Sequence, residues 1–324
     1  MQTVVNDIFR PLDKKLLEPV GEASKGLTYW KDVFSRLKKN KVAMVSLSII
    51  ILIFLLAIFL PMFLPYTYSD QFIGEENRTP SWTHIMGTDS LGRDMLVRIL
   101  FGARVSLSVG IFASIVNLTI GVLYGGIAGY KGGKLDTVMM RIVDVLYSVP
   151  LMLYVILLSV VLKPRMAELF RLPALQWLQT AGPGLVSMYV AIGISYWVTT
   201  ARIVRGQILS LKEQEFVTAA KALGAGGSRV LFKHLIPNCI GPIVVTTMLL
   251  IPDAIFTESF LSFIGLGVDA PMASLGSLAS DALGGIRSYF YLLLFPSLVI
   301  SITILVFNIF GDGLRNALDP RMRK

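Results

Sequence analysis

Three carboxylates inside apolar stretches are the residues best placed to do chemistry in this sequence. Asp144, Asp253 and Glu258 each interrupt a run of mostly apolar residues. A charge at mid-membrane costs roughly 2.5–3.5 kcal/mol on insertion scales, so such a group should face a polar cavity or a partner. We expect all three, together with Phe256, to line a translocation path. Asp253 and Glu258 have an open alternative, which is hydrogen bonding within the helix bundle or across a subunit interface.

The segment Gly87–Asp94 has the glycine spacing of a phosphate-binding loop. Such a loop needs a Lys followed by Ser or Thr to hold phosphate and magnesium. Here Arg93 and Asp94 follow the second glycine instead, so the segment predicts no nucleotide site. We expect Asp89, Arg93 and Asp94 to pair locally and to order a loop outside the membrane.

The sequence gives no support for metal, disulfide or catalytic chemistry. Cys239 is the single cysteine, and the two histidines, His84 and His234, lie far apart. The chain has no Ser/His/Asp set and no HExxH motif. We therefore expect no catalytic residue, no metal site and no cofactor bound by this chain.

The composition is that of a polytopic membrane protein built from helices. Hydrophobic residues make up 54% of the chain and charged residues 16%, against roughly 25% charged in soluble domains. The net charge of +9 is explained by basic residues gathered in loops on one side of a membrane. No nucleic-acid partner is expected.

Six segments are apolar over the roughly 20 residues that a helix needs to cross the hydrocarbon. They are Val42–Leu64, Val105–Tyr130, Thr137–Leu162, Gly184–Val204, Ile240–Phe260 and Tyr289–Phe310. The predicted regions are an N-terminal segment 1–41, a first transmembrane helix 42–64, an extracytoplasmic loop 65–104, a five-helix core 105–310 and a basic tail 311–324.

The distribution of Lys and Arg predicts the orientation. Most of them fall in the two terminal segments, in 131–141 and in 202–233, which places both termini in the cytoplasm. Residues 29–39 have one apolar helical face among basic residues. We interpret this stretch as a helix lying on the lipid surface in preference to a partner-binding site.

Glycine and proline positions predict how the spans pack. Gly121, Gly125 and Gly129 repeat every four residues, which permits close approach of a neighbouring helix. Pro150, Pro252 and Pro296 each remove a backbone donor and should kink their helices. Such kinks suit a bundle that opens and closes.

Residues 213–237 form a loop between two predicted spans, on the predicted cytoplasmic side, and its residues have a helical spacing pattern. Four residues spaced as one helical face are Phe216, Ala219, Ala220 and Leu223. Acidic residues in the first turn and Gly224 after the last predict the two ends of this helix. We expect Ser228 to cap a second helix, Arg229–Leu235, which Pro237 ends. A bare alanine face suits a groove on another protein better than it suits lipid.

This segment resembles the EAA loop of ATP-binding-cassette importer permeases. The match consists of Thr218-Ala219-Ala220, Gly224 and His234-Leu235-Ile236-Pro237, with Thr218 where the family commonly has Glu. In that family the loop is a coupling helix seated in a groove of the cytoplasmic ATPase. The resemblance implies coupling roles for Glu215, Phe216, Ala219, Ala220, Leu223, Gly224, Arg229, His234 and Pro237.

Two further stretches are similar to OppC/DppC-type permeases of peptide and nickel importers. They are His84–Asp94 and Glu258–Gly267. The basic residues 36–41, which precede the first span, also resemble this family. The resemblance runs from about residue 29 to the last residue. Leu275 departs from it, because the family usually has Trp there.

The resemblance implies the type I importer fold of six transmembrane helices, with the coupling helix between spans four and five. It implies a bacterial or archaeal inner-membrane subunit that moves oligopeptides or dipeptides. The implied partners are a homologous second permease, two ATPase subunits that bind ATP and Mg, and an extracytoplasmic substrate-binding protein. Asp89, Arg93 and Asp94 could dock that binding protein.

Two other functions compete with this interpretation. A secondary transporter driven by protons or sodium could use Asp144 and Asp253 as a proton relay, but the two halves of the chain show no convincing repeat. The sequence contains no catalytic motif that would indicate a membrane enzyme. We therefore expect an importer permease.

Overall fold

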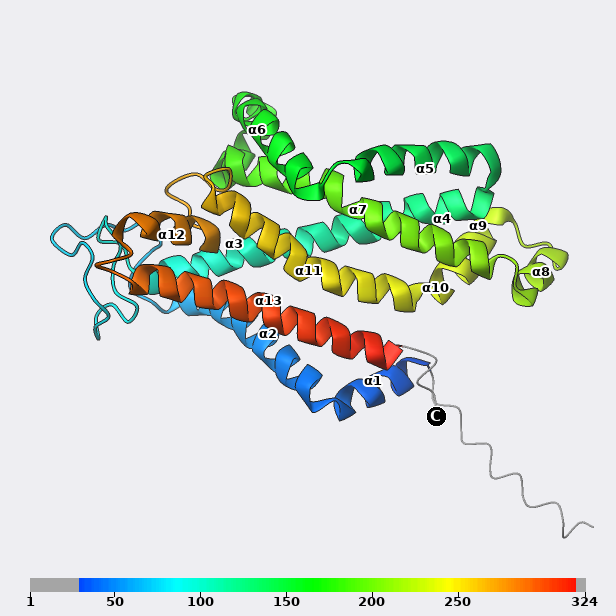
Figure 1. The fold of residues 1–324 in the computed structure, drawn as a ribbon, viewed down its shortest axis with the longest axis horizontal. Helices are drawn as coiled ribbons and strands as arrows, with labels where there is room; N and C mark the ends of the chain where they lie inside the picture. Colours follow the sequence, from blue (N-terminus) through cyan, green and yellow to red (C-terminus); the bar gives the residue numbers. More distant parts are fainter. Residues whose placement is uncertain (1–28, 319–324) are drawn as a thin grey trace, which may run out of the picture.

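The computed structural model describes residues 29–318, and almost all of them are helical (Figure 1). The helices are α1 (Tyr29–Lys39), α2 (Lys41–Phe59), α3 (Met95–Val116), α4 (Val122–Lys131), α5 (Gly133–Ser148), α6 (Leu151–Leu169), α7 (Pro183–Leu211), α8 (Glu215–Ala222), α9 (Gly227–Arg229), α10 (Ile236–Asn238), α11 (Ile240–Phe263), α12 (Leu275–Asp281) and α13 (Tyr291–Leu318). Within the described part, β-structure is limited to a single bridge between Thr88 and Asp94.

Long apolar helices match the predicted spans. Five are long and apolar enough to cross a membrane, and a sixth span results if the bent pair α5–α6 is counted as one. The five cover Lys41–Met62, Met95–Lys131, Pro183–Leu211, Ile240–Phe263 and Tyr291–Leu318. The predicted all-α membrane fold is confirmed.

The second span begins at Met95 and not at Val105, so the loop before it ends at Asp94. The Asp94 side chain caps the helix by accepting the N–H of Val97 at 2.9 Å. Arg98 and Arg104 make the first turns look polar in sequence. Arg98 is buried, and Arg104 donates to the carbonyl oxygen of Ala57 at 3.0 Å.

The third predicted span, Thr137–Leu162, is broken in two. Helices α5 and α6 meet at 87°. The break falls at Val149, which is extended, and Pro150, because proline lacks an N–H and disfavours helix in the residue before it.

Pro252 and Pro296 behave differently, since α11 and α13 continue through them. Helix α13 also runs on to Leu318, so the predicted tail begins as helix.

The glycines of the second span lie against α7, as their spacing predicts. A Cβ built on Gly125 would stand 2.2 Å from the carbonyl oxygen of Ala201, and one on Gly129 would stand 2.8 Å from that of Arg205. The backbones of α4 and α7 therefore touch with no room for a side chain. This contact fixes α7, which lines the cavity described below.

The elements divide between the two ends of the bundle. Helices α1 and α8 and the end of α13 lie at one end, whereas α12 and the loop before α3 lie at the other (Figure 1). Helix α1 is anchored by Val33 and Leu37, which pack with Ala317 and Leu318. Its other apolar residues, Trp30 and Phe34, are exposed, as a helix resting on lipid requires.

We predict that Gly125→Ala destabilises the bundle, because its methyl group would push α4 away from α7. Overpacking of this kind costs about 1–3 kcal/mol. The thermal midpoint of unfolding of the detergent-purified protein should therefore fall. Gly206→Ala is the control, since nothing lies within 4 Å of a Cβ there. Equal stability of Gly125→Ala and the wild type would contradict the close contact.

Candidate translocation cavity and docking surface

Helix α8 ends on the glycine that the sequence assigned to its cap. Gly224 has a φ of +83°, a conformation that favours glycine. The N–H of Gly224 donates to Lys221 at 2.9 Å and that of Ala225 donates to Ala220 at 3.0 Å. These two bonds form a Schellman cap, which holds the last turn of α8 in place.

Helix α8 presents an uncovered apolar face, as its spacing predicts. We call this set the α8 face: Phe216, Ala219, Ala220 and Leu223. Phe216 is 40% exposed and Leu223 89% exposed. On the opposite side Val217 is fully buried against Val230 and Leu235. The helix is thus fixed to the bundle by one side, and the α8 face is left exposed.

The segment after α8 differs from its prediction in two ways. Ser228 does not cap it, because α9 starts at Gly227 with no side-chain cap. Helical structure also passes through Pro237 to Asn238, since a proline in the first turn of a helix lacks only a donor that has no partner there. Arg229 and Pro237 are exposed and His234 is half-buried.

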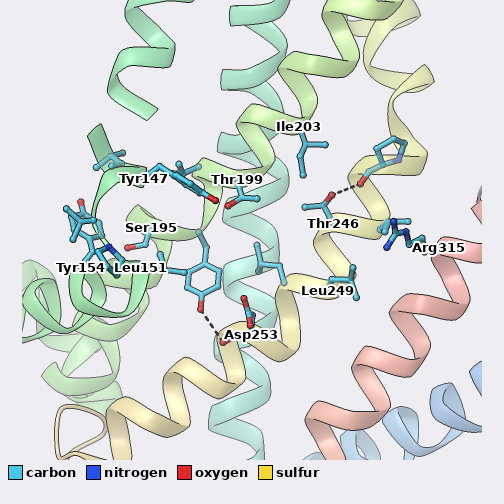
Figure 2. Close-up of a pocket in the computed structure, with 18 of the residues that line it drawn as sticks. Tyr147, Leu151, Tyr154, Ser195, Thr199, Ile203, Thr246, Leu249, Asp253 and Arg315 are labelled. Carbon is cyan, nitrogen blue, oxygen red and sulfur yellow. Dashed lines mark hydrogen bonds between the residues drawn. The ribbon is translucent and has the colours of Figure 1, made fainter. Parts of the chain in front are cut away.

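A cavity of about 900 Å³ opens between α7, α11, the α5–α6 junction and the end of α13 (Figure 2). Its lining residues are Leu146, Tyr147, Val149, Pro150, Leu151, Tyr154, Ser195, Tyr196, Val198, Thr199, Ile203, Gly241, Pro242, Val245, Thr246, Leu249, Leu250, Asp253, Arg315 and Leu318. The walls are apolar with scattered hydroxyl groups, a surface that accepts varied side chains and offers hydrogen bonds to a backbone.

Two charged side chains border this cavity, Asp253 on α11 and Arg315 on α13. The backbone carbonyl of Asp253 accepts a hydrogen bond from the Tyr196 hydroxyl at 3.2 Å. That hydroxyl also shares a 2.7 Å hydrogen bond with Thr257. Tyr196 therefore ties α7 to α11 at the turn that carries Asp253.

The structure brings only Asp253 of the four expected path residues to the cavity. Asp144 pairs with Arg202 at 2.6 Å, and Phe256 is exposed elsewhere on α11. Glu258 has no exposed surface. It accepts hydrogen bonds from Ser106, from Ser262 at 2.9 Å and from Ser259 at 3.3 Å. The alternative of hydrogen bonding within the bundle describes Glu258 correctly.

Ion pairs between α5 and α7 were missed from the sequence. Asp136 accepts two hydrogen bonds from Arg205, both at 2.6 Å, and Arg202 binds Asp144. The Arg202 guanidinium also lies 4.1 Å from the centre of the Tyr147 ring, which lines the cavity. Two acids on one helical face and two arginines on a later span are the signal that could have revealed the pairing.

The outer-loop residues are buried and paired, as the local-pairing interpretation requires. Asp89 binds Arg93 at 2.7 Å and also Arg98. Asp94 accepts from His84 at 2.8 Å as well as capping α3. Asp89, Arg93 and Asp94 are each less than a tenth exposed. Their burial means that Asp89, Arg93 and Asp94 themselves offer little surface to another protein. The described residues contain no group of three His, Cys, Asp or Glu suited to a metal.

Two family models match the chain. One describes a binding-protein-dependent transport system inner membrane component and covers residues 121–324. The other describes the N-terminal transmembrane domain of oligopeptide transport permease C and covers residues 28–80. The first includes α7, α8 and α11, which carry the α8 face and most of the cavity.

Several characterised proteins are similar over nearly the whole chain. The oligopeptide transport system permease protein OppC of Bacillus subtilis is 47% identical over 324 residues, covering 100% of both chains. The dipeptide transport system permease protein DppC of the same organism is 46% identical, covering 92% of this chain and 88% of its own. OppC of Escherichia coli is 41% identical, covering 92% and 93%.

A solved structure shares the fold. A chain of the MetNI methionine ABC transporter, in a crystal form described as inward facing, superposes with a TM-score of 0.53 and 17% identity. The match covers 69% of this chain and 98% of that chain. The two chains therefore share a helical arrangement.

We predict that Asp89→Asn loosens the outer loop, because it removes the carboxylate that binds Arg93 and leaves Arg98 with only the more distant Asp281, at 3.9 Å. Removing one partner of a buried pair costs about 3–5 kcal/mol. Backbone amides of residues 63–94 should exchange hydrogen faster, as mass spectrometry would measure. Asp70→Asn is the control. Hydrogen bonds from the Thr67 side chain and backbone lower the pKa of the exposed Asp70 carboxyl, but Asp70 pairs with no arginine in the described loop. Equal exchange in both variants would contradict the role of Asp89.

Proposed function

Because the chain belongs to the family of binding-protein-dependent transport system inner membrane components, we propose that it is a permease subunit of an ATP-driven importer of oligopeptides or dipeptides. The full-length identity to a characterised oligopeptide permease is the observation that carries this conclusion. No comparison supports an ion-driven transporter. The role of this chain is transport, with the chemistry of ATP in other subunits.

The proposed complex brings three kinds of partner to this chain. A second, homologous permease closes the cavity from the side that this chain leaves open. Two ATPase subunits bind ATP and Mg and dock at the α8 end. A substrate-binding protein delivers the peptide to the opposite end, where Ile73 and Trp82 are almost fully exposed. Asp89, Arg93 and Asp94 serve that contact by holding the loop in shape.

The proposed orientation in the inner membrane places the α8 end in the cytoplasm. Lys and Arg concentrate in the segments at that end, and such residues favour the cytoplasmic side. The end of α13 and helix α1 lie there too (Figure 1). Both termini would then be cytoplasmic.

The α8 face is the proposed seat for an ATPase subunit, with Glu215, Gly224, Arg229, His234 and Pro237 supporting it from the same segment. Movement of the ATPase reaches the cavity through packed residues. Val217 of α8 shares one apolar cluster with Val204 and Ile208 of α7 and Ile243 of α11. Because α7 and α11 both line the cavity, a displacement of α8 shifts its walls.

We predict that Ala219→Glu abolishes ATP-driven uptake of a labelled tripeptide into proteoliposomes holding the assembled importer. An unpaired charge buried in an interface costs about 3–5 kcal/mol, so the ATPase recovered with the permease should fall at least about tenfold. Thr218 is exposed and lies outside the α8 face, so Thr218→Glu adds the same charge there and should leave uptake unchanged. Persistent uptake by Ala219→Glu, or uptake by the wild type that needs an ion gradient and no ATP, would contradict the function.

We also predict that Gly224→Val weakens ATPase association while Gly224→Asn does not. The left-handed conformation costs an L-residue roughly 1–2 kcal/mol, but asparagine is tolerated at this cap position. Open space surrounds Gly224, so side-chain size alone does not distinguish the two variants. Co-purification of the ATPase with each variant measures the effect, and equal recovery would show that the cap is not needed.

A further inference from the structure

Asp253 differs from Asp136, Asp144 and Glu258 in having no partner for its carboxylate among the described residues. Asp136 and Asp144 bind arginines of α7, and Glu258 is surrounded by serine hydroxyls. The Asp253 carboxylate makes no hydrogen bond or ion pair within the part of the chain that the structure describes. A charge inside a membrane span is costly unless a ligand or partner compensates it. The cavity is where that compensation must come from.

The position of Asp253 is rigid. Its neighbours Pro252 and Ala254 are buried, and Tyr196 of α7 holds its backbone carbonyl. Figure 2 shows the side chain on the cavity wall, facing the space bounded by Ser195 and Thr199. The carboxylate is thus held ready for a ligand within a largely apolar site.

We propose that Asp253 binds the N-terminal ammonium group of the peptide as it passes through the cavity. This inference rests on the proposed function. Peptides differ in their side chains, so a wall that serves many of them can use only the groups that they share, which are the two termini and the backbone amides. Among these the ammonium is the one cation, and it forms a charge-assisted hydrogen bond with a carboxylate.

The opposite charge on the same cavity supports this assignment. Arg315 borders the cavity from the end of α13, beyond Thr246 and Leu249 of α11 (Figure 2). A carboxylate and a guanidinium bordering the same cavity favour a zwitterion over an anion or a neutral solute. They also favour a peptide with its amino terminus toward Asp253.

The test compares two labelled tripeptides, one with a free amino terminus and the same one acetylated, in proteoliposomes holding the complete importer. We expect Asp253→Asn to slow uptake of the free peptide about tenfold and that of the acetylated peptide less than twofold. Asp253→Glu keeps the charge and should retain the preference. Asp312→Asn removes an exposed carboxylate of α13 outside the cavity and should change neither rate. The wild-type binding protein serves every variant, so any selectivity that it adds cancels.

Four outcomes would overturn the inference. An unchanged preference in Asp253→Asn would show that the carboxylate does not bind the ammonium. An equal loss for both peptides that Asp253→Glu restores would assign Asp253 to a cation of the second permease. If the wild type takes up only the free peptide, Asp253→Lys should slow it further than Asp253→Asn, and equal rates would contradict the charge effect. Failure of the wild type to accumulate either peptide would overturn the proposed function itself.

Discussion

The apolar cluster that contains Val217 together with Val204, Ile208 and Ile243 is the feature on which the proposed coupling of this subunit depends. It joins a short helix outside the bundle to the two helices that form the cavity walls. The glycine contact between α4 and α7 holds α7 in position, and the cluster can form only while α7 stays there. A loose contact at either point would let α8 move without moving the walls.

The charged residues show how the membrane constrains the same helices. Each acid inside a span must be compensated, and the structure does this by an arginine on a neighbouring helix for Asp136 and Asp144 and by serines for Glu258. These devices hold the bundle together without facing the cavity. Asp253 differs from these three, because its carboxylate has no partner among the described residues, and this gives the cavity the binding character that we propose.

The sequence predicted the features that depend on local spacing. Hydropathy located the spans, the i, i+3, i+4, i+7 pattern located the α8 face, and Gly224 marked the end of α8. It failed where distant residues decide. Arg98 and Arg104 hid the start of α3, because their partners Asp89 and Ala57 belong to other segments. The cavity draws on four regions of the chain, so no local pattern could separate Asp253 from Glu258.

The break at Val149 and Pro150 gives one wall of the cavity a joint. Helix α5 ends at Ser148, Val149 is extended, and the helical hydrogen bonds of α6 begin at the carbonyl oxygen of Pro150. Leu146, Tyr147 and Leu151 line the cavity on either side of that joint. Rotation about the backbone bonds of these two residues can therefore change the width of the cavity while the helical turns on either side stay intact. The cavity can change shape in this way without the energetic cost of breaking helical hydrogen bonds.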